Sequence, residues 1–141
     1  MGQGHFRGHS AGSHPTGRID PRAIGLLQRL NFPTGALRSK DWAAFADEGA
    51  PVMDFVFTIC DRAAGKVCPV WPGQPISAHW GFPDPAAFEG SQAETEAFFA
   101  EVYGQIERCV SIFVGLRFDA LDQLSLKRRL DELGRNLPQS A

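Results

Sequence analysis

The middle of the chain carries the clearest strand pattern. Residues Val52–Ile59 are almost continuously apolar, which is typical of a strand buried on both faces of a parallel sheet. A shorter segment, Ile76–Trp80, predicts a further strand. Near the amino terminus, His5–Gly12 predicts a short strand that runs into the glycine- and serine-rich loop SAGSHPTG.

Helical spacing behind recognisable N-caps appears in the segments between and after these strands. Asp20 is followed by proline, a combination that favours the start of a helix. Ser39 starts a short helix, and a Ser-x-x-Glu capping box begins at Ser91. A last amphipathic helix is predicted over Asp119–Leu133. The helix after Ser91 carries an apolar stripe at Phe98, Val102, Ile106, Cys109, Ile112 and Phe113.

Strands that alternate with helices predict an α/β sandwich, in which functional sites lie beyond the carboxyl ends of the strands. The 141 residues suit one domain, and the net charge of −2 gives no reason to expect a nucleic acid or an anionic membrane as partner. No apolar run reaches the length of a membrane span, and the amino terminus lacks the apolar core of a signal peptide. We therefore expect a cytoplasmic protein whose cysteines are reduced at rest.

Two of the three cysteines stand close together directly after the strand 52–59. Cys60 and Cys68 enclose the segment DRAAGKV, in which Gly65 allows a bend. Thiol–disulfide exchange needs a thiolate, and the nearby cations Arg62 and Lys66 favour one. The spacing fits a redox pair and two small buried or idle thiols equally well. Cys109 falls in the apolar stripe of the long helix, which indicates core packing.

Asp84 stands between two prolines, Pro83 and Pro85, which restrict its backbone. This arrangement suits a general acid that has to be presented at one point, and it also suits ordinary turn chemistry. His79 beside Trp80 is more typical of a structural contact than of a base or a ligand. The four histidines lack zinc-like spacing with the cysteines, so we expect no metal and no other cofactor.

With these residues in hand, the chain resembles the arsenate reductases built on the low-molecular-weight tyrosine phosphatase fold. The resemblance reaches from the start of the chain to about Leu116, and the last helix resembles an extension seen in some members. It implies a domain over 1–116 with a helical extension over 117–141. The matching segments, in order, are SAGSHPTGRIDPRAIGLL, LRSKDWAAFA, DFVFTICDRAAGKVCP, HWGFPDPA and the long helix from Ser91.

The resemblance implies a role for each of the candidate residues. Cys60 matches the cysteine that attacks a thiol–arsenate adduct and releases arsenite, and Cys68 matches the cysteine that then attacks Cys60. The disulfide is reduced by thioredoxin or another thiol reductant. Asp84 matches the general acid. Ser10, Ser13 and Arg18 lie in or near the loop that borders the active site in the family, although solvated loop residues explain them equally well.

One part of the family pattern is absent from this sequence. The family begins with a strand that runs into a Cys-x5-Arg-Ser loop, which holds the oxyanion and supplies the nucleophile. The residues six positions after the three cysteines are Lys66, Gln74 and Gly115, so none supplies the arginine. We therefore expect a truncated three-layer α/β sandwich of the phosphatase type whose first and central strand is missing. The unpaired strand edges would favour self-association, and the chain as printed would neither reduce arsenate nor hydrolyse aryl phosphates.

Three functions stay open on the sequence. The first is an arsenate reductase-like protein that acts on arsenate or a phosphate-like oxyanion with a thiol reductant. The second is a low-molecular-weight phosphotyrosine phosphatase, which would not need Cys60 and Cys68 as a relay. The third is a non-catalytic homologue that binds a partner in response to redox state.

Overall fold

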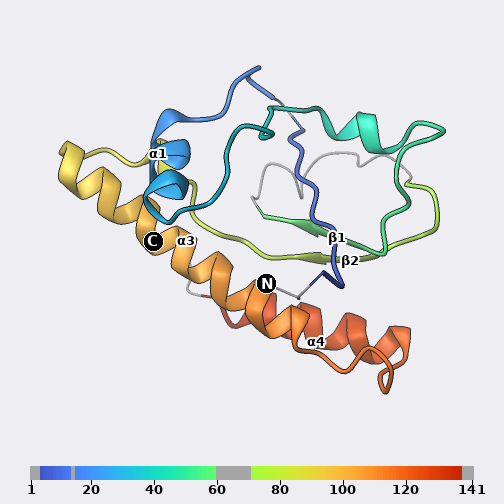
Figure 1. Ribbon diagram of the computed structural model, residues 1–141. Helices are drawn as coiled ribbons and strands as arrows, with labels where there is room; N and C mark the ends of the chain where they lie inside the picture. The colour runs from blue at the N-terminus through green and yellow to red at the C-terminus, as the bar shows by residue number, and fades with distance from the viewer. Residues whose placement is uncertain (1–3, 14, 60–70, 138–141) are drawn as a thin grey trace.

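The computed structural model describes residues 4–13, 15–59 and 71–137. In chain order, its elements are α1 (Pro21–Arg29), η1 (Trp42–Phe45), β1 (Phe55–Thr58), β2 (Ile76–His79), η2 (Pro85–Ala87), α3 (Gln92–Val114) and α4 (Gln123–Arg135). The sheet lies between α3 and α4 on one side and η1 with its loops on the other (Figure 1). None of the helices in the described part of the chain is both long and apolar enough to cross a bilayer.

The N-caps that the sequence predicts are mostly in place. Asp20 caps α1 by accepting a hydrogen bond from the Arg22 N–H at 2.9 Å. Ser91 and Glu94 form both hydrogen bonds of a capping box at the start of α3. The short helix after residue 39 is a 3₁₀ turn, and its cap is Asp41 rather than Ser39. These helices start where a side chain satisfies the first free N–H groups.

Strands β1 and β2 pair in parallel, with Phe55 opposite Ile76 and Thr58 opposite His79. Both strands are confirmed, although each is shorter than its apolar run. The predicted strand over His5–Gly12 is wrong: within it only Gly12 pairs, in a single parallel bridge to Asp41. This segment does not pair with β1, so its backbone lacks the ladder that would make it a strand.

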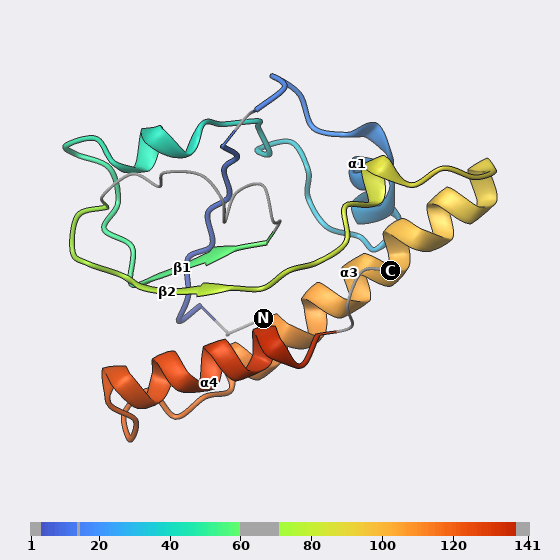
Figure 2. The ribbon, with the colours of Figure 1, turned by 180° about the vertical axis from the view of Figure 1, so that it is seen from behind.

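The core lies between the sheet and the helices α3 and α4 (Figure 2). Phe57 stacks on Trp80 with ring centres 4.0 Å apart, and Phe55 meets Phe113 edge to face at 5.0 Å. Cys109 is buried as expected, whereas Ile112 from the same predicted stripe is 44% exposed. The buried members of this cluster are Ala78, Trp80, Phe82, Val102, Cys109 and Leu130.

Helix α4 covers the outer edge of β2. The Lys127 ammonium donates a hydrogen bond to the Ser77 carbonyl at 2.6 Å, on the edge that faces away from β1. The Trp80 indole N–H donates to the Leu130 carbonyl at 3.0 Å, and Leu130 is fully buried. Gly134 lies directly against the carbonyl of His79. The last helix is therefore packed into the same core as the sheet.

Candidate functional site

The carboxyl ends of the two strands meet at one point, where a cross-strand hydrogen bond joins their last paired residues. Thr58 Oγ1 and His79 Nδ1 lie 2.8 Å apart, and the tautomer of the imidazole decides which of the two donates. Thr58 is half-buried and His79 is exposed. His79 therefore makes a structural contact, as its position beside Trp80 suggests, and this contact fixes the point at which the chain leaves β1.

A cavity of about 360 Å³ lies at this end of β1. Two of the predicted loop residues, Ser10 and Ser13, line it together with Thr58 and Ile59. The remaining wall is mostly aromatic, with Trp42 and Trp71 in an edge-to-face contact at 6.1 Å. The serine-rich loop therefore reaches the carboxyl end of the strand, as the sequence predicts for residues that border an active site.

The aromatic wall was not predicted as part of a site. Its members come from η1, from the segment after the described gap and from the segment after β2: Trp42, Phe45, Trp71, Trp80 and Phe82. In the sequence these residues look like scattered apolar positions, and no spacing rule connects them. Their convergence depends on the loops that surround β1.

The predicted acid, Asp84, lies on a separate loop. Its carboxylate caps η2 by accepting a hydrogen bond from the Ala86 N–H at 3.0 Å, so the turn reading of the Pro-Asp-Pro segment is confirmed. Asp84 is exposed, and neither it nor Arg18 lines the cavity of Ser10 and Ser13. A capping role does not conflict with proton donation, because a carboxyl group keeps a second oxygen.

Arg22 is a charged neighbour of Asp84 that the sequence did not single out. It makes two side-chain hydrogen bonds to Asp20, at 3.0 and 2.8 Å, and its guanidinium lies 4.9 Å from the centre of the Phe99 ring. The hydrogen bond to Asp20 is the main reason that the pKa of Arg22 is raised, and the charge of Asp84 adds to it. An arginine thus stands within electrostatic reach of the predicted acid.

The three cysteines are placed differently. Cys60 and Cys68, with their predicted roles, lie outside the described residues. Cys109 is 3% exposed on α3, and burial raises the pKa of its thiol. It therefore belongs to the core and is a poor nucleophile. The described residues contain no group of three or more metal-ligating side chains.

Comparisons with known proteins place this arrangement in one family. The sequence pattern of the "low molecular weight phosphotyrosine protein phosphatase" family matches residues 1–127, and the chain belongs to this family. A curated relative named arsenate reductase, from Halalkalibacterium halodurans, is 31% identical over 105 residues, which are 74% of this chain and 72% of that protein.

Two further relatives match over shorter stretches, and both carry the name arsenate reductase. The protein from Bacillus licheniformis is 43% identical over 60 residues, or 43% of this chain and 42% of that protein. The protein from Bacillus subtilis is 45% identical over 53 residues, or 38% of this chain and 37% of that protein. In both cases the matched stretch spans less than half of the relative's length.

Proposed function

We propose that this chain is an arsenate reductase-like protein that takes part in thiol-based oxyanion chemistry. The observation that carries the proposal is the family membership together with relatives that bear that name. The cysteine pair supports it, because a phosphatase of the same family has no use for a relay. The serine loop at the carboxyl end of β1 supports it as well, since sites in open α/β sheets form there.

The proposed relay uses Cys60 and Cys68 as one redox pair. In the complete reaction a first thiol binds arsenate, a second thiol attacks it, and arsenite leaves as two thiols become a disulfide. Arsenate gains two electrons, and the two sulfurs lose them. Cys68 then takes over the bond to Cys60, and thioredoxin or another thiol reductant returns both to thiols. Such a cycle suits a cytoplasmic location, where thiols are kept reduced.

The first thiol needs an oxyanion-binding loop of the Cys-x5-Arg-Ser type, which this sequence does not contain. We propose that the complete fold is a three-layer sandwich in which a strand bearing that loop lies beside β1. The chain as printed is then expected to perform the second half of the cycle only. Electrostatic stabilisation by such a loop is usually a dominant catalytic contribution, so arsenate turnover is expected to be undetectable.

The test separates the two halves of the cycle. The chain is oxidised with diamide, and thioredoxin with its reductase and NADPH is added; one thioredoxin-reducible disulfide per chain is expected. Cys60→Ser and Cys68→Ser should each abolish NADPH consumption, whereas the matched control Cys109→Ser should not. Consumption that survives both substitutions, or a disulfide that involves Cys109, would exclude the relay.

A second assay addresses the oxyanion half. Arsenate and an aryl phosphate are offered to the chain alone and to a version that carries an upstream strand with Cys-x5-Arg-Ser. Arsenate-dependent NADPH consumption by the longer version alone is the expected result. Aryl phosphate hydrolysis that does not depend on Cys60 would favour the phosphatase instead.

A further inference from the structure

Strand β1 has one edge without a hydrogen-bonded partner in the described part of the chain. Asp54 and Thr58 accept hydrogen bonds from β2 at 3.0 and 2.8 Å, so the backbone groups of the residues between them alternate. The N–H and C=O groups of Phe55 and Phe57 therefore face away from β2. Among the described residues none bonds to them, whereas the outer edge of β2 is covered by α4.

The segment 5–11 forms a second wall opposite this edge. It passes beside β1, and its backbone makes no hydrogen bond to another described residue. Pairing begins at Gly12, and it uses the far side of the segment, where Gly12 bonds to Lys40 and Trp42 at 2.9 and 3.0 Å. Two stretches of extended backbone thus border the same space, with free polar groups on each. Unpaired backbone groups are costly when they are kept from water, so both walls favour a partner.

We name the space between these walls the edge slot. It is a cavity of about 1790 Å³, bounded by residues 4–9 on one side and by the edge of β1 on the other. The smaller cavity at the carboxyl end of β1 shares several of its lining residues, so the space continues along the whole strand. The shared residues are His9, Met53, Phe55, Phe57, Trp80 and Val110.

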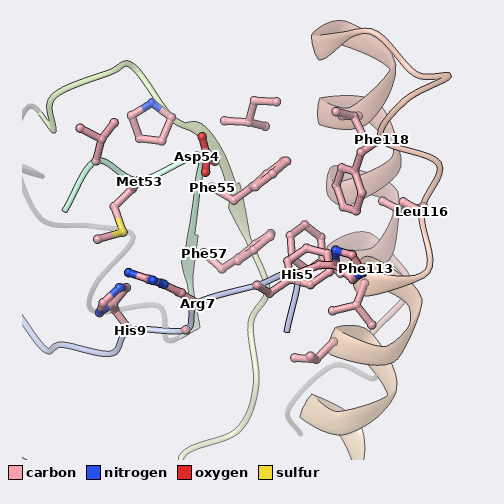
Figure 3. A pocket seen from close by; sticks show the side chains of 18 of the residues that line it. His5, Arg7, His9, Met53, Asp54, Phe55, Phe57, Phe113, Leu116 and Phe118 are labelled. Atoms are coloured by element: carbon pink, nitrogen blue, oxygen red, sulfur yellow. The ribbon is translucent and has the colours of Figure 1, made fainter. Parts of the chain in front are cut away.

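The two faces of the edge slot differ in chemistry. Toward α3, Phe55 and Phe57 point at Phe113, and this side is apolar (Figure 3). On the opposite side, Arg7 and His9 lie together beside Met53 (Figure 3). Side chains alternate between the two faces along a strand, so a strand in the slot would place every second residue on the apolar side and the others near the cationic side.

We propose that the edge slot binds one extended polypeptide strand supplied by a separate chain, with alternating apolar and acidic side chains. Its backbone would pair with Phe55 and Phe57 on one side and with residues 5–11 on the other. A single strand suits the slot better than the sheet edge of a second folded copy, because the segment 4–9 closes the far side. The inference extends the proposed sheet, but its test involves no cysteine and is independent of the relay.

The test uses the full chain and the peptide Val-Glu-Val-Glu-Val-Glu-Val with blocked ends. Amide hydrogen exchange is followed by NMR with and without this peptide. Exchange at Phe55, Phe57 and the segment 5–11 should slow by at least about tenfold when the peptide is bound, because these N–H groups gain acceptors. Val56, which already bonds to β2, serves as the internal reference.

Two controls decide how the peptide is held. A peptide of the same sequence with alternate amides N-methylated keeps its side chains but cannot form both ladders, and it should give no protection. Arg7→Glu should weaken binding of the acidic peptide by about two- to fivefold, as is usual for an exposed charge pair. Arg38→Glu makes the same charge change at an exposed residue outside the slot and should leave affinity unchanged.

Three results would overturn the proposal. The first is equal binding of the N-methylated peptide, which would indicate apolar contact without strand pairing. The second is unchanged exchange at Phe55 and Phe57 at millimolar peptide. The third is protection of these amides without peptide that rises with protein concentration, because a second copy of the chain would then fill the slot.

Discussion

The contact between α4 and β2 can be tested at one glycine. Gly134 lies in the last turn of α4, where an added Cβ would overlap the carbonyl oxygen of His79. It would also lie 3.3 Å from Cδ1 of Trp80. Both obstacles are held in place, the first by the β ladder and the second by the indole hydrogen bond to Leu130. Gly134→Ala therefore has to push the helix away from the sheet.

Two opposing effects set the magnitude. Alanine in place of glycine within a helix stabilises by about 0.5–1 kcal/mol. Overpacking of a filled contact costs about 1–3 kcal/mol, and more when backbone is the obstacle. Gly104 provides the matched control, because it lies within α3 with no atom within 4 Å of its added Cβ. We expect Gly104→Ala to raise and Gly134→Ala to lower the free energy of unfolding, with about 2–4 kcal/mol between them.

The assay is urea unfolding followed by circular dichroism and by tryptophan fluorescence, with equal m-values required of the compared proteins. Trp80 is buried against Leu130, so displacement of α4 should also shift its emission to the red in the native state. If Gly134→Ala were as stable as Gly104→Ala and left the emission unchanged, α4 would not lie against β2 as described.

Three further predictions follow from local contacts. Arg22 holds the pKa of Asp20 below its usual value through a side-chain hydrogen bond, so the stabilisation is present above about pH 4 and is lost as pH falls through the lowered pKa. Asp20→Asn keeps a good N-cap and should cost less than about 1 kcal/mol near pH 7 and nothing at pH 2, as thermal melts would show. Ser91→Ala should destabilise the protein by about 1 kcal/mol in urea unfolding, because it removes a cap of α3. Cys109 should react with Ellman's reagent only after unfolding, and rapid labelling of the native protein would contradict its burial.

Local signals in the sequence fixed where most elements begin. The caps at Asp20 and Ser91 were predicted correctly because each depends on atoms within four residues. The end of α1 was predicted for the same reason: Asn31 adopts a positive φ of 64°, which asparagine tolerates after a helix. The apolar run before Cys60 predicted β1, and the segment before the HWGF motif predicted β2.

Long-range contacts decided what the sequence left open. Residues 5–12 have a pattern that suits a strand, but a strand exists only where another backbone accepts its hydrogen bonds. The apolar stripe of α3 includes Ile112, and only the curvature and position of the neighbouring elements leave that side chain exposed.

The candidate site shows the same division. Its chemistry, the cysteine pair and the serine loop, is readable from residue types in the sequence. The meeting of Ser10, Ser13 and Thr58 around one cavity depends on three separate segments, and so does the position of Arg22 near Asp84. Fifty residues separate Trp80 from Leu130 and Ser77 from Lys127, and no local propensity encodes contacts at that distance. The free energy of such contacts comes from the assembled core, so only the tertiary structure decides them.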